Sequence, residues 1–74
     1  MRYYSIHRPV APGTFPKAVK VNEIHNFDKR IFCEEIGREA WGWIDYVGEL
    51  DKKDAEAYEL VKQKREAENE YRNN

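Results

Sequence analysis

The stretch EEIGREAWGWIDY, residues 34–46, decides the fold of this chain, because it reads either as part of a helix or as part of a β-hairpin. Helical spacing places several apolar side chains of residues 32–47 on one face. Against a helix, Gly37 and Gly42 would each cost a helix interior about 1 kcal/mol relative to alanine. The tryptophans, isoleucine and tyrosine of the stretch are residues that strands favour. We therefore prefer the hairpin and keep the helix as the alternative.

The preferred hairpin has strands over residues 30–36 and 40–47, joined by a turn at residues 37–39. Glycine supplies the positive φ that tight hairpin loops require. Side chains alternate along a strand, so Trp41 and Trp43 share one face. The other face of this strand is also apolar, which leaves one aromatic group either under a loop or exposed. An exposed tryptophan pair would form an apolar patch of the kind that binds a partner.

Two further strands are predicted before the hairpin. RYYSIHR, residues 2–8, alternates between the two faces of a strand, and Pro9 ends it because proline has no N–H for a ladder. AVKVNEI, residues 18–24, gives the second strand. Residues 26–29, NFDK, then read as a turn.

All three prolines of the chain lie in RPVAPGTFPK, residues 8–17, which must be a loop. Pro12 and Gly13 suit a turn, and Phe15 is predicted to tuck inward and pin the loop. Ten residues is long for a connection in so small a domain, and such loops often carry function.

The last segment, GELDKKDAEAYELVKQK and the residues after it, predicts a helix from about Asp51 to Lys64 or beyond. Asp51 is a natural N-cap, and alanine, glutamate and lysine are strong helix formers. Leu60 and Val61 fall on its apolar face. Residues 65–74 can bury little and are predicted to be a charged, frayed helix end.

These elements predict a single α+β domain over residues 1–64, with a small antiparallel sheet of three or four strands packed against one C-terminal α-helix. One domain is also what 74 residues allow, and the 14% aromatic content supplies large rings for a small core. The predicted core consists of Tyr4, Ile6, Phe15, Val19, Val21, Phe32, Ile44, Leu60 and Val61.

Charge excludes a strong bulk attraction to nucleic acid or to anionic membranes, since the formal net charge is −1. The distribution is uneven: residues 1–30 carry six Lys/Arg against two acids, or +4, and residues 31–74 carry seven against twelve, or −5. No apolar run is long enough to cross a bilayer, so we expect no membrane association and a cytoplasmic location.

The residues that carry chemistry in other proteins are sparse here. His7, His25 and Cys33 match no zinc-ligand spacing, so no metal site is expected. Cys33 precedes Glu34 and Glu35, whose negative charge opposes formation of a reactive thiolate. The proline-rich loop lacks the repeated glycines of a phosphate loop. The sequence therefore predicts a protein that is not an enzyme and takes no cofactor.

Four segments taken in order, YYSIHRPVAPGTFP, NFDKR, EEIGREAWGWIDY and AYELV, resemble a group of small proteins encoded by phages and integrative elements of anaerobic gut bacteria. The resemblance covers most of residues 3–61 and rests on a Pro-Gly-Thr-aromatic-Pro loop and a Gly-Arg-x-Ala-aromatic-Gly run. It implies a bacterial, cytoplasmic accessory protein, and it brings no catalytic residues with it.

We expect a small accessory or regulatory protein of a mobile element that binds another protein, because tryptophan, tyrosine and arginine dominate binding hot spots. The chain itself is expected to be a monomer or a weak homodimer. The candidate partner-binding residues are Tyr3, His7, Phe15, Trp41 and Trp43.

The alternative is a weak single-stranded nucleic-acid binder, in which bases stack on exposed rings beside basic side chains. In that case the stacking platform would consist of Tyr3, His7, Trp41 and Trp43. The cations near them would be Arg2, Arg8, Lys17, Lys20 and Arg30.

Overall fold

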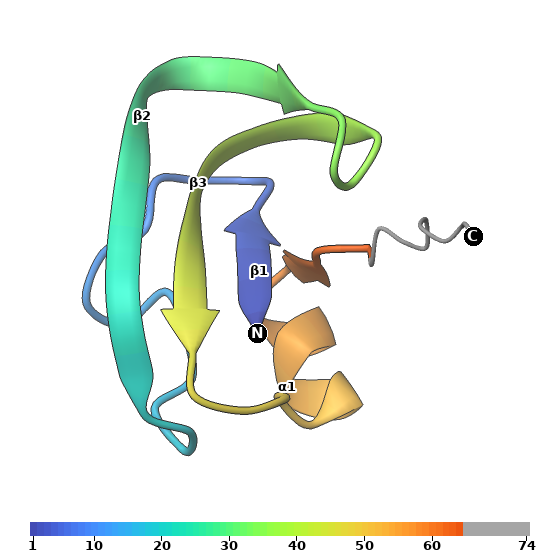
Figure 1. Cartoon of the computed structure of the whole chain (residues 1–74). Coiled ribbons are helices and arrows are strands. Elements are labelled where there is room, and N and C mark those ends of the chain that lie inside the picture. The colour runs from blue at the N-terminus through green and yellow to red at the C-terminus, as the bar shows by residue number, and fades with distance from the viewer. Residues whose placement is uncertain (65–74) are drawn as a thin grey trace.

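The computed structural model describes residues 1–64, which form a four-stranded antiparallel sheet and one short helix. The elements in chain order are β1 Arg2–Ser5, β2 Val21–Cys33, β3 Arg38–Tyr46, α1 Lys52–Ala57 and β4 Leu60–Lys62. The strand order across the sheet is β2-β3-β1-β4. Figure 1 shows β1 inside the sheet, with the long β2 running along its outside.

β1 confirms the first predicted strand but is shorter than expected. It pairs with β3 along one edge and with β4 along the other. Tyr3, Tyr4 and Ser5 are all buried. The chain bends directly after Ser5, where the serine Oγ donates a hydrogen bond to the carbonyl of Arg8. This local bond ends the strand before Pro9 is reached.

The hairpin prediction is confirmed, since β2 and β3 pair in antiparallel fashion up to Cys33 and Arg38. The turn occupies residues 34–37, slightly earlier than predicted. Gly37 has φ 68°, and its N–H donates to the carbonyl of Cys33 at 2.9 Å. Gly37 therefore supplies the positive φ, but at the end of the turn.

The predicted turn at residues 26–29 is wrong, because β2 is one continuous strand of 13 residues. β3 pairs with both halves of it, and the register shifts between Asn26 and Ile31. The extra residues on β2 form a bulged stretch, and a bulge bends its strand. In Figure 1 the hairpin correspondingly curves over the rest of the sheet.

The long C-terminal helix is a second correction. Asp51 is the N-cap as predicted, and its side chain accepts a bond from the Lys53 N–H, but α1 ends at Ala57. Glu59 has φ 58°, outside the helical region, and Leu60–Lys62 then form β4 along the second edge of β1. The observed order is therefore β-β-β-α-β. The predicted frayed end at residues 65–74 lies outside the described residues.

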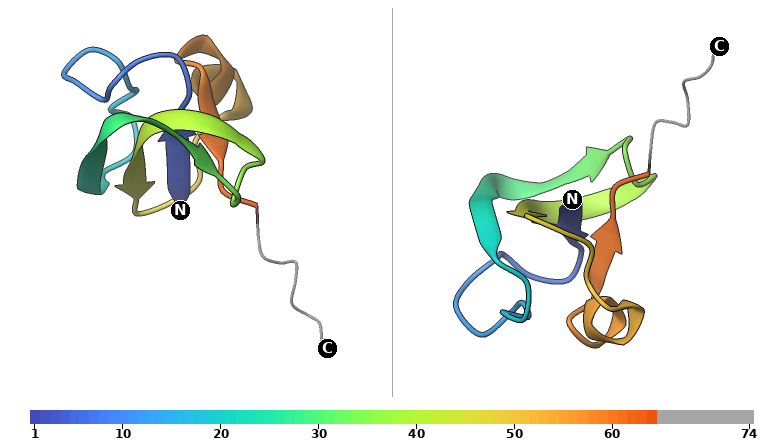
Figure 2. Two further views of the ribbon diagram at one scale, coloured as in Figure 1. Left: turned by 90° about the horizontal axis from the view of Figure 1, so that it is seen from above. Right: turned by 60° about the horizontal axis from the view of Figure 1, so that its bottom comes forward.

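The sheet carries one apolar cluster on each side. The first core packs the proline-rich loop and the segment around α1 against the sheet, and Figure 2 shows the loop and α1 on the same side. Its buried members are Tyr3, Val10, Phe15, Ile44, Tyr46, Leu50 and Leu60. The second core lies under the curved hairpin end and contains Tyr4, Cys33, Ile36 and Ala40.

Two tyrosine hydroxyls fix the loops over the first core. The Tyr46 hydroxyl donates to the carbonyl of Pro16 at 2.8 Å, and the Tyr3 hydroxyl accepts from the Leu50 N–H at 2.9 Å. Phe15 is buried, so it pins the long loop as predicted.

Most of the predicted core is buried or packs against a core cluster, but Phe32 is an error. Its side chain is 61% exposed. Phe32 pairs with Glu39, and alternation along the hairpin turns this pair away from the neighbouring Cys33, which points into the second core.

Candidate interaction surface

The outer side of the hairpin end carries two rings that neither core contains. Phe32 lies opposite Glu39, and Trp41 follows two residues later on the same side of β3. Arg30 joins them, because its Nε lies 2.9 Å from Glu39 Oε1. We call Arg30, Phe32, Glu39 and Trp41 the hairpin-end patch. In the described part of the chain, neither ring packs in a core cluster.

β2 adds an open strand edge beside this patch. Within residues 1–64 it pairs with β3 alone. Alternate residues of a strand point their N–H and C=O groups to opposite edges, so half of these groups on β2 face no strand. Ile24, Ile31 and Phe32 are 42%, 38% and 61% exposed. An exposed, long and partly apolar edge is a template on which another chain can pair.

Trp43, by contrast, packs against the second core. The guanidinium carbon of Arg2 lies 3.6 Å from the ring centroid of Trp43, a cation–π contact. The His25 ring stacks at 5.4 Å between centroids and 24° between planes. Arg2 belongs to β1 and His25 to β2, which flank β3 on its two sides. The indole ring is therefore occupied within the protein and offers no free face for a base.

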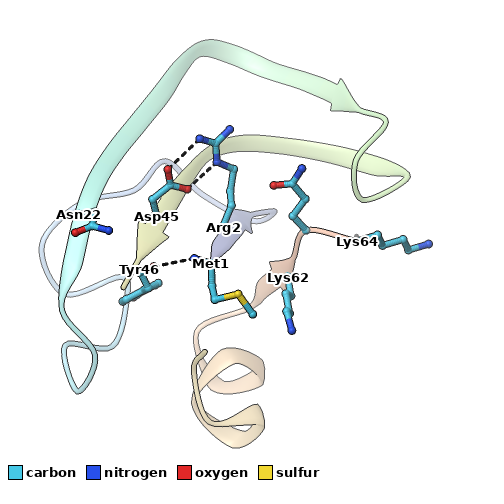
Figure 3. A pocket seen from close by; sticks show the side chains of 8 residues that line it. Met1, Arg2, Asn22, Asp45, Tyr46, Lys62 and Lys64 are labelled. Atoms are coloured by element: carbon cyan, nitrogen blue, oxygen red, sulfur yellow. Dashed lines mark hydrogen bonds and ion pairs between the residues drawn. The ribbon is translucent and has the colours of Figure 1, made fainter. Parts of the chain in front are cut away.

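Arg2 is itself neutralised by Asp45. Its Nε and Nη2 donate to the two carboxylate oxygens at 2.7 and 2.9 Å. These hydrogen bonds and the guanidinium charge hold the pKa of Asp45 below its usual value. The pair borders an open groove of about 610 Å³, in which Figure 3 shows Arg2 and Asp45 facing one another. Lys62 on the groove wall is bonded to Glu49, and Lys64 also lines the groove.

The five predicted partner-binding residues do not form one surface. Tyr3 and Phe15 are buried, with 2% and 9% of their surface exposed, so both pack in the first core. His7 is exposed, and its Nε2 lies 3.8 Å from Glu59 Oε2. Trp41 lies in the hairpin-end patch, and Trp43 packs against the second core. Of the two tryptophans, Trp41 is the one outside both core clusters, and the open edge belongs to the neighbouring strand β2.

Residues 1–65 match the family model described as Defence against restriction A C-terminal. The chain belongs to this family. The match covers nearly the whole chain, and it agrees with the phage resemblance drawn from the motifs: the protein is a phage-related accessory protein. Comparison with curated proteins and with solved structures gave no match.

In this family member, Phe32 is the exposed ring that sequence reasoning missed. Phe32 was predicted as a core residue of the α+β domain. Strand alternation contained the correct signal, because in a hairpin Cys33 and Phe32 must point to opposite sides.

Cys33 of this family member is a buried free cysteine. Burial and the nearby Glu35 raise the pKa of the Cys33 thiol, which keeps it protonated. Among residues 1–64, no group of three His, Cys, Asp or Glu side chains is placed to hold a metal ion. The same residues contain no helix long and apolar enough to cross a membrane.

Proposed function

We propose that this phage-related accessory protein is non-catalytic and acts by binding another protein through the hairpin-end patch and the adjoining open edge of β2. The observation that carries the proposal is the 61% exposure of Phe32 beside Trp41, on a strand with one unpaired edge. Rings and arginine of this kind dominate binding hot spots.

Burying the exposed Phe32 ring against a partner is more favourable than leaving the ring in water. Covering the exposed part of a phenylalanine removes on the order of 100 Å² of apolar area from water, or about 2 kcal/mol. A strand added to β2 would also satisfy its outward N–H and C=O groups, as in β-strand addition. The family description, defence against restriction, supports a task performed alongside other phage or host proteins.

The nucleic-acid alternative has less support. Trp43 is enclosed between Arg2 and His25, and Arg2 is paired with Asp45. In the hairpin-end patch, Glu39 neutralises Arg30 and the acidic Glu34 follows closely. A phosphate backbone would meet little free positive charge there.

Affinity capture with immobilised protein tests the proposal. Wild type is compared with Trp41→Ser and Phe32→Ser, in lysate of phage-infected cells, and bound proteins are identified by mass spectrometry. Val47→Ser is the control, since Val47 is 56% exposed but lies beyond the end of β3. We expect both patch variants to lose the bound protein at least about tenfold while the control retains it.

Two results contradict the proposal. One is a bound protein that stays on both patch variants, provided thermal unfolding shows that the variants are folded. The other comes from titration with labelled single-stranded oligonucleotides at low salt. Tryptophan quenching that weakens as salt rises would support the nucleic-acid alternative instead.

A further inference from the structure

A second open strand edge lies at the other margin of the sheet, along β4. Within residues 1–64, β4 pairs with β1 alone. The Gln63 N–H donates to the Arg2 carbonyl at 2.8 Å, so the backbone groups of Val61, two residues earlier, also face β1. The N–H and C=O groups of Leu60 and Lys62 therefore point away from β1, toward the open edge.

A groove of about 390 Å³ lies between β4 and α1 at this margin, where Figure 1 shows α1 below β4. Its lining includes Tyr3, Leu50 and Leu60, which belong to the first core and are 2%, 6% and 6% exposed. The groove therefore reaches down to the apolar core, and its floor suits an apolar side chain.

The two ends of the groove carry opposite charges. At one end, Lys62 Nζ lies 2.9 Å from Glu49 Oε2, which joins the end of β4 to the segment before α1. Lys52, the first residue of α1, lies at this end. Glu56 lies at the other end, where α1 leads back into β4. Within residues 1–64 no ion pair involves Lys52 or Glu56, so both charges are available to a ligand.

We propose that this groove binds an extended peptide segment of a protein partner, which adds to β4 as an antiparallel strand and has the order acidic–x–apolar–x–basic. Such a strand begins opposite Lys62 and continues past Leu60. Its acidic side chain then lies near Lys52, its apolar side chain over Leu60, and its basic side chain near Glu56. The site is separate from the hairpin-end patch, so it does not depend on the proposed function.

Side-chain alternation supports this order. Leu60 belongs to the first core, whereas the next residue, Val61, packs against the second core. The first, third and fifth side chains of an added strand share one face, so all three point to the groove. The strand begins no earlier than Lys62, because the next outward N–H, that of Lys64, already donates to the Glu35 carbonyl at 3.2 Å.

NMR titration of the isotope-labelled full chain tests the site. The probe is the synthetic peptide Glu-Thr-Leu-Thr-Arg with blocked ends, and its control is the reversed peptide Arg-Thr-Leu-Thr-Glu, which has the same composition. We expect the amide signals of Leu60 and Lys62 to shift with the probe. The reversed peptide should bind at least about tenfold more weakly, because it places like charges together at both ends of the groove.

A double variant, Lys52→Glu with Glu56→Lys, supplies the matched test on the protein. Both changes suit the helix dipole, with the acid in the first turn and the base in the last, so the variant should stay folded. Its groove has the opposite charge order. We therefore expect it to prefer the reversed peptide over the probe.

Four outcomes overturn the peptide site. They are no shift with the probe up to about 5 mM, equal binding of the two peptides, an unchanged preference in the folded double variant, and β4 signals that move on dilution without peptide. The last would mean that a second copy of the chain occupies the edge. Shifts at Phe32 and Trp41 with none at Leu60 would also remove this site, and they would support the proposed function instead.

Discussion

β1 and β2 are both strands rich in aromatic and branched residues, yet the fold uses them in opposite ways. β1 has four residues, pairs along both edges, and places Tyr3 in the first core and Tyr4 in the second. β2 has 13 residues, pairs along one edge, and buries only Cys33. The difference shows that in a domain this small the exposure of an aromatic side chain depends on the position of its strand in the sheet.

One row of residues across the sheet shows the transition. Tyr3 of β1 lies opposite Ile44 of β3, and Ile44 lies opposite Ile24 of β2. Their exposed fractions are 2%, 0% and 42%. Side chains of the same row therefore pass from full burial to exposure within one strand spacing.

Truncation at two positions of this row is expected to give the largest contrast. Ile44→Ala leaves a cavity in the first core and should lower the free energy of unfolding by about 2–5 kcal/mol. Ile24→Ala, the matched change at the edge, should cost about 0.5 kcal/mol or little more. Urea denaturation of both variants measures the difference. Equal losses would mean that β2 is covered to the same degree as β3.

Gly42 lies on β3 at the point where it pairs with the edge strand β2. A methyl group at this position should weaken the pairing of the two strands. A Cβ at this position would lie 2.4 Å from the His25 carbonyl oxygen, a backbone atom that cannot rotate away. Gly42→Ala should therefore cost about 1–3 kcal/mol. Gly48→Ala is the control, since its nearest neighbour would be Val19 Cγ1 at 3.9 Å. If Gly42→Ala left the free energy of unfolding unchanged, β2 would be held loosely against β3.

Tyr46 makes a smaller contribution, which depends on pH. Burial, with a lesser effect of Tyr3, raises the pKa of Tyr46 to about 12, above the usual value of 10.0. The folded state then holds this proton more tightly than the unfolded state, so stability is complete below pH 10 and falls as pH rises toward 12. Tyr46→Phe also removes the bond to the Pro16 carbonyl and should cost about 1–2 kcal/mol at neutral pH.

Thermal unfolding between pH 8 and pH 11.5 checks the sign. The wild type should lose stability across the alkaline part of this range, and Tyr46→Phe should lose less. Part of the loss should remain in the variant, because burial and Glu35 also raise the pKa of Tyr4. A variant with the full wild-type slope would exclude Tyr46 as the source.

Local sequence was sufficient for the hairpin and for the start of the helix. Gly37, Gly42 and the aromatic run favour strands over a helix, and Asp51 caps α1 as its side chain predicts. It was insufficient for β4, because Leu60 and Val61 continue a helical pattern. The second edge of β1 lies far away in sequence, and pairing with it outweighs local helix propensity.

Prediction of the candidate site from local sequence was limited in the same way. Trp41 was predicted as a partner-binding residue from its strand, and the structure leaves it outside both cores. The enclosure of Trp43 depends on Arg2, which reaches it only because β1 pairs with β3. Phe32 was assigned to the core from its apolar side chain, although alternation with Cys33 places it on the other side of the strand.

Amide hydrogen exchange, resolved by residue in dilute solution, tests most directly whether β2 is an open edge. The account predicts that the amides of β1 exchange slowest, since both edges of that strand are paired, and that β2 shows alternating protection, with every second amide exchanging quickly. Uniform slow exchange along β2 in the dilute monomer would contradict it, because those amides would then already have partners.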